Sequence, residues 1–145
     1  MIVSFFGHRD CPYGIYPRLV KTVESLVLQN DKITFLIGEE GVFDRLALKA
    51  VKEISEMYAY VEYYIVLAYY KEDKPSEPSL YPEEVAMSLP KFSISTRNKW
   101  IIEKSDLVIT YVKRNWGGAY QSKKRAIKKG KCVVELYEGE NKKPI

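Results

Sequence analysis

"ISTRNKWIIEKSDLVITYVKRNWGGAYQSKKRAIKKGK", residues 94–131, has the pattern of a helix–strand–helix unit. A helix is predicted over residues 95–104, and the apolar run at 107–112 predicts a buried strand. A Trp-Gly-Gly bend follows, and a second helix is predicted over residues 119–129. Because a helix start offers free backbone N–H groups, a strand followed by Gly-Gly and a helix is a candidate anion site. A plain tight loop is the alternative, since Gly-Gly often marks turns.

The same alternation continues outward on both sides of this unit. Apolar runs predict four further strands, over residues 2–6, 33–37, 61–70 and 132–136. Apolar residues at helical spacing predict two further helices, one across Ile15–Val27 and one across Phe43–Ile54. Strands that alternate with helices predict right-handed crossovers and an α/β fold. We expect a mostly parallel sheet of about five strands, covered by helices on both faces.

Length and composition bound the organisation of the chain. The 145 residues fit a single domain over residues 1–145. Residues 71–92 are rich in Pro, Ser and charge, which predicts a long loop. The tail from about residue 138 is expected to be flexible.

Several classes of protein are disfavoured by what the sequence lacks. No run approaches the ~18 apolar residues that a membrane span needs, and no secretory signal is evident. We therefore expect a cytoplasmic protein without a membrane partner. Cys11 and Cys132 lie far apart without CxxC spacing, so they are expected to be reduced. His8 is the single histidine, and no metal site is expected.

The net charge of +4 includes a basic cluster close to the C-terminus. Its members are Lys123, Lys124, Arg125, Lys128, Lys129 and Lys131. Such a cluster can bind nucleic acid by neutralising phosphates. A solvated helix face is the favoured interpretation, because charge runs usually are solvated faces and aromatic residues are not interleaved here. Nucleic acid is therefore not the expected partner.

The loops that follow the strands hold the candidate site residues, because parallel sheets bind ligands beyond the carboxyl ends of their strands. Gly7 permits a sharp turn after the first strand. Arg9 could bind a phosphate or carboxylate through its guanidinium group, or could pair with a surface acid. His8 could donate a hydrogen bond to a ligand or have a structural role.

The loop after the second strand and the helical turn that follows it contain two glycines and three acids. Gly38 and Gly41 bracket a turn that opens a helix. Glu39 and Glu40 suit a phosphate poorly because like charges repel, but they could accept hydrogen bonds from ribose hydroxyls. Asp44 lies in the first helical turn, where an acid also favours the helix dipole.

The loop after residues 107–112 is the stronger anion candidate. Gly117, Gly118 and Ala119 form the bend and the helix start. Trp116 and Tyr120 could stack on a base, although aromatic residues beside a loop more often pack against the protein.

Arg97 and Asn98 lie close to the start of the predicted helix before that strand. Arg97 would add positive charge to the crevice, and Asn98 an amide that both donates and accepts. An exposed pair without a role is the alternative.

In order along the chain, five short motifs resemble those of the SLOG superfamily, and more narrowly its YpsA-like branch. They are Gly7-His8-Arg9, Gly38-x-x-Gly41-x-Phe43-Asp44, Arg97-Asn98-Lys99-Trp100, Ser105-Asp106 and Gly117-Gly118-Ala119. The resemblance covers residues 2 to about 136. It implies a Rossmann-like three-layer α/β/α sandwich that binds nucleotides or nucleotide-derived ligands. Similar proteins include the LOG phosphoribohydrolases, the nucleotide-binding domain of DprA, and domains thought to sense NAD- or ADP-ribose-type signals.

One departure from the LOG pattern bears on activity. LOG enzymes carry a P-G-G-x-G-T-x-x-E segment, whereas this chain reads Trp116-Gly117-Gly118-Ala119-Tyr120-Gln121-Ser122-Lys123. The glutamate that would assist departure of the base is missing, and a glycosidic hydrolase needs such a group. Glu39 or Glu40 could substitute from the other side of the cleft.

The expected function is therefore binding, sensing or sequestration of a phosphate-bearing nucleotide, of an NAD- or ADP-ribose-derived kind, by a non-enzymatic or weakly enzymatic module. An N-glycosidic hydrolase of nucleoside monophosphates is the alternative, and a nucleic-acid-binding protein is a second one. No cofactor is expected apart from the bound nucleotide. Homo-oligomerisation is also expected, because SLOG relatives often pair.

Overall fold

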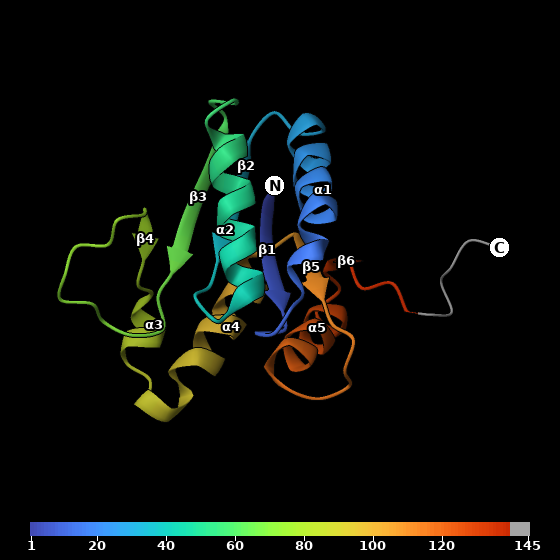
Figure 1. Ribbon diagram of the computed structural model, residues 1–145. Coiled ribbons are helices and arrows are strands. Elements are labelled where there is room, and N and C mark those ends of the chain that lie inside the picture. Colours follow the sequence, from blue (N-terminus) through green and yellow to red (C-terminus); the bar gives the residue numbers. More distant parts are fainter. Residues whose placement is uncertain (140–145) are drawn as a thin grey trace.

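A computed structural model describes residues 1–139, which form one six-stranded parallel sheet between two layers of helices (Figure 1). The strand order is β4-β3-β2-β1-β5-β6. The strands are β1 (Ile2–Gly7), β2 (Ile33–Ile37), β3 (Val61–Val66), β4 (Ser79–Leu80), β5 (Leu107–Tyr111) and β6 (Cys132–Glu135). The helices are α1 (Tyr16–Leu28), α2 (Val42–Ser55), α3 (Glu83–Ala86), α4 (Ser93–Lys104) and α5 (Gly118–Lys128), with 3₁₀ turns η1 (Tyr13–Ile15) and η2 (Pro90–Phe92).

Apolar side chains that point alternately to the two faces of the strands form a core on each side of the sheet. Phe5 and Phe35 face α1 and α2, and their rings stack with centroids 5.8 Å apart. Phe6 and Leu36, one residue further along, belong to the second core under α4 and α5. Because neighbouring residues of a strand point to opposite faces, each apolar run serves both cores. The α/β sandwich with parallel strands is confirmed.

The chain between β3 and α4 differs from the prediction. The predicted strand 61–70 ends at Val66, since its partner β2 ends at Ile37, which pairs with Ile65. The predicted loop 71–92 contains β4, α3 and η2. Ser79 and Leu80 pair with the end of β3 and add a sixth strand to the sheet. A two-residue strand has too short an alternation to be recognised from sequence.

The predicted flexible tail falls partly outside the described residues. Glu138 lies 3.5 Å from Arg18 of α1 in an ion pair, and residues 140–145 are not described. Within residues 1–139, no helix is long and apolar enough to cross a membrane.

The strand order places a crevice between β1 and β5. From β1 the chain builds outward through β2, β3 and β4, and then returns to the other side of β1 to add β5 and β6. Ligands of parallel α/β sheets bind at such a reversal, beyond the carboxyl ends of the strands. The loops after β1 and β5 flank this point.

Candidate anion-binding cleft

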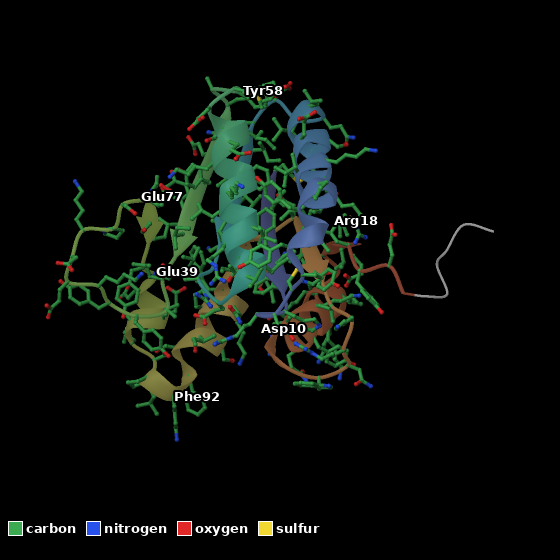
Figure 2. All side chains as sticks on the ribbon, in the orientation of Figure 1. Asp10, Arg18, Glu39, Tyr58, Glu77 and Phe92 are labelled. Atoms are coloured by element: carbon green, nitrogen blue, oxygen red, sulfur yellow. The ribbon has the colours of Figure 1, made fainter. Side chains whose placement is uncertain are left out.

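A cleft of about 430 Å³ lies at the carboxyl ends of β1, β2 and β5. Figure 2 shows Asp10 and Glu39 at this end of the molecule, with Tyr58 at the opposite end. The predicted residues that line the cleft are Gly7, His8, Arg9, Gly38, Asp44, Arg97, Asn98, Trp116, Gly117, Gly118 and Ala119, and Glu40 joins them. Four segments far apart in sequence thus meet at one place.

Three predicted residues lie outside the lining. The Glu39 side chain turns to Lys71, with the Lys71 Nζ 2.8 Å from its Oε2, and it lines a neighbouring hollow. Gly41 begins α2 against the backbone of Arg9, where an added Cβ would lie 2.6 Å from the Arg9 Cα. The Tyr120 ring lies under the Lys124 ammonium group at 5.9 Å.

The N-terminus of α5 forms one wall of the cleft. Gly117 is its N-cap residue, with φ of 94°, and no side chain caps the first turn or places an acid there. The first amides of an α-helix have no acceptor within the helix. An added Cβ at Gly118 would meet no atom within 4 Å. The protein therefore leaves open space beside these N–H groups.

Arg97 comes from α4 and is 1% exposed. Its Nε donates to the Asn98 Oδ1 at 2.9 Å, and its Nη1 donates to the Val66 carbonyl at 3.2 Å. The guanidinium group therefore fixes the end of β3, while its charge still lies beside the cleft.

Glu40 bridges the two arginines that the sequence predicted as anion ligands. Its Oε2 lies 2.8 Å from the Arg9 Nη2, and its Oε1 lies 3.5 Å from the Arg97 Nη2. The Glu40 carboxylate thus occupies donors that a ligand phosphate would use. An incoming anion has to compete with it.

Asp44 is buried at the start of α2. Burial raises the pKa of its carboxyl to about 6, although the hydrogen bond from the Glu40 N–H and the charge of Arg97 oppose that rise. The Glu40 N–H donates to Asp44 Oδ2 at 2.7 Å. Asp44 therefore holds the loop that carries Glu40.

His8 holds the loop between β5 and α5. Its Nε2 accepts hydrogen bonds from the backbone N–H groups of Lys113, at 3.0 Å, and Arg114, at 3.3 Å. Burial lowers the pKa of His8, and the neighbouring charge of Arg114 lowers it further. Because Nε2 accepts, the proton of the neutral ring is on Nδ1.

Arg114 and Asp10 also line the cleft, and sequence reasoning missed both. The Arg114 guanidinium donates to both Asp10 oxygens, at 3.0 and 3.1 Å, and lies 4.7 Å from the centroid of the Trp116 ring. Its buried Nε has no hydrogen-bond partner among the described residues. The position of Arg114 in a loop that follows a strand was the signal available.

Comparison with known proteins bears on the fold. No protein-family model and no curated protein matches the chain. A solved structure of DNA processing protein A (DprA) from Streptococcus pneumoniae is similar, with a TM-score of 0.70 and 18% sequence identity. The chain has a Rossmann-like fold. The match covers 95% of this chain and 50% of the DprA chain, so the chain spans about half the length of that protein. The Rossmann-like fold that the sequence resemblance implied is thereby confirmed.

Proposed function

We propose that the cleft binds a phosphate-bearing nucleotide of the NAD- or ADP-ribose-derived kind, and that the protein senses or sequesters it as a member of the YpsA-like branch. The observation that carries the proposal is the uncapped N-terminus of α5, which faces a cleft also lined by Arg9, Arg97 and Arg114. Free helix N–H groups and a positive dipole end favour an anion.

The cleft offers a place for each part of such a ligand. A phosphate fits beside Gly118, where the backbone lacks a side chain. Trp116 is 61% exposed at the cleft and offers a ring face to a base. When the phosphate displaces Glu40 from Arg9, the carboxylate is free to accept hydrogen bonds from ribose hydroxyls.

A thermal-shift series with AMP, ADP, ADP-ribose and NAD tests the proposal, using Gly118→Ala and Gly14→Ala as matched variants. An added Cβ meets no atom within 4 Å at either glycine, but only Gly118 lines the cleft. At a ligand concentration of 100 Kd, binding stabilises the fold by about 2.7 kcal/mol. We expect a rise of several degrees in the wild type and in Gly14→Ala, and a much smaller rise in Gly118→Ala.

The proposal fails if no nucleotide of the panel shifts Tm, or if the two glycine variants respond alike. Isothermal titration with the nucleotide that gives the largest shift supplies the Kd and the stoichiometry independently of unfolding.

A second candidate function is cleavage of an N-glycosidic bond. It is favoured by one observation: the Glu40 carboxylate lines the cleft, whereas Glu39 is paired with Lys71 outside it. Incubation with nucleoside monophosphates and with NAD, followed by chromatography of the released base, tests for turnover. If the protein is a hydrolase, the wild type and Glu39→Gln should release base, and Glu40→Gln should not. Tight binding without base release removes this candidate.

A further inference from the structure

A basic surface covers the outer side of α4 and α5, away from the cleft. Two shallow hollows in it share Arg125. The charged residues that line them are Lys99, Lys104, Lys124, Arg125, Lys128 and Lys129, with Glu84 and Glu103. We call these residues the α4–α5 face. The sequence indicated only the part on α5, and the fold adds Lys99 and Lys104 from α4.

The charge of the molecule is concentrated on the α4–α5 face. Its six cations and two carboxylates give a formal charge of +4, which equals the net charge of the whole chain. The rest of the chain is therefore neutral on balance. Among the described residues, Lys129 is the one cation of this face with a carboxylate partner, Glu103 at 3.4 Å.

The side chains of α5 divide cleanly between the core and this surface. Ser122 and Ala126 are buried, whereas Lys124 and Lys128 are exposed and one helical turn apart. Lys123 belongs to neither group, because its Nζ lies 2.7 Å from the Glu135 carboxylate. Lys123 of the basic cluster seen in the sequence is thus half-buried and paired with Glu135, and the remaining members on α5 form an outward row of positive charge.

The aromatic content of the face indicates which part of a nucleic acid it suits. Trp100 is the one aromatic residue that lines either hollow, and the Lys104 ammonium group lies over its ring at 5.6 Å. Binding of single strands relies on several aromatic rings on which bases stack. Contact with phosphates needs only positive charge, and it releases condensed counterions from the duplex.

We propose that the α4–α5 face binds the phosphate backbone of double-stranded nucleic acid without reading its sequence. This inference is independent of the proposed nucleotide site, because the cleft lies at the carboxyl ends of the strands and shares no residue with the two hollows.

Fluorescence anisotropy with a labelled duplex of roughly 20 base pairs, titrated between about 50 and 200 mM salt, tests the proposal. The test variant is Lys124→Glu/Lys128→Glu. Lys21→Glu/Lys32→Glu is the matched control, because it makes the same charge change at two exposed lysines distant from the face. Circular dichroism checks that both variants fold.

Wild type and control are expected to bind with log Kobs falling linearly against log salt, by about 0.9 for each phosphate contacted. In the test variant, affinity at low salt is expected to fall at least about tenfold, and the slope to decrease by roughly 2.

The proposal is overturned if the wild type does not bind the duplex at low salt, or if the control variant loses as much affinity as the test variant. Tighter binding of a single strand of equal length, or equally tight binding to anionic phosphatidylserine vesicles, would overturn it as well. Displacement of the duplex by a nucleotide that fills the cleft would also reject this face as the binding surface.

Discussion

At His8, one ring nitrogen fixes the loop that carries the Trp-Gly-Gly bend. The Nε2 atom accepts two successive backbone N–H groups from a segment more than 100 residues away. Protonation of Nε2 would turn this acceptor into a donor and would oppose both N–H groups. The neutral ring is therefore part of the architecture of the cleft.

We predict that His8→Leu lowers the free energy of unfolding by about 1–3 kcal/mol, because two backbone donors lose their acceptor. His8→Gln, which keeps a side-chain acceptor, should recover part of the loss. Urea unfolding at neutral pH measures both. An unchanged midpoint in His8→Leu would contradict the assigned role.

The pH dependence of the same contact has a defined sign. The pKa of His8 is lowered in the folded state, so the unfolded chain binds its proton more readily. The contribution of His8 to stability is thus complete above the unfolded pKa of about 6.5, and it is lost as pH falls from there through the lowered folded pKa.

At the scale of elements, Glu135 joins β6 to β5 and α5. It accepts hydrogen bonds from the Thr110 hydroxyl (2.8 Å), the Val112 N–H (3.0 Å), the Lys123 ammonium (2.7 Å) and the Tyr137 N–H (2.9 Å). Burial alone would raise the pKa of Glu135, but the bonds from Lys123 and the other donors outweigh it, and the pKa is lowered. The edge of the sheet is thereby fixed by one carboxylate.

We predict that Glu135→Leu destabilises the fold by roughly 1–3 kcal/mol, since four donors lose their acceptor. Glu138→Leu, at an exposed ion pair, should change stability by less than about 0.5 kcal/mol. The folded pKa of Glu135 is lowered. The difference in free energy of unfolding between wild type and Glu135→Leu should therefore be largest above the pKa of the unfolded state, and it should shrink as pH falls through the folded pKa. Chemical denaturation at several pH values checks this.

The elements that sequence patterns predicted well are those with long periodicity. The apolar strands and the four longer helices were predicted to within a few residues, because each buries one or two complete faces. The sheet edge was not, since β4 depends on pairing with β3 rather than on its own two residues. Arg114 was missed because its place in a loop after a strand, which many residues share, was the only local signal. Its two partners, Asp10 and the Trp116 ring, are brought beside it by the loops that follow β1 and β5.

For the glycines too, the local sequence does not show which distant residues lie beside them. Sequence reasoning treated Gly7 as a turn, but an added Cβ there would lie 2.3 Å from the Phe43 ring, so the residue permits α2 to pack against the end of β1. Gly118 meets no such neighbour. The folded structure, rather than the sequence, distinguishes a glycine beside which a neighbouring side chain packs from a glycine beside which space for a ligand remains.

At the scale of the whole molecule, the segment between β3 and α4 presents exposed apolar side chains. They are Tyr69, Tyr70, Tyr81, Met87, Leu89 and Phe92, each at least 36% exposed. Scattered exposed apolar residues are normal, but several along one segment mark a surface for association.

The sequence-based prediction of a homo-oligomer is testable at this segment. Sedimentation velocity across a concentration series should show self-association of the wild type, and Leu89→Asp/Phe92→Asp should weaken it at least tenfold. Leu28→Asp, at an exposed residue of α1, is the control. A wild type that stays monomeric at the highest concentration would contradict the prediction.

The central place of β1 has a consequence for synthesis. β1 pairs with β2 about 30 residues later, but its other edge pairs with β5, where Val3 meets Leu107. Until residues 107–111 leave the ribosome, one side of β1 has no neighbour, and an unpaired strand edge favours association with other chains. Newly made protein is therefore prone to association with other chains until residues 107–111 have emerged and paired with β1. Slower elongation during that period should increase misassembly.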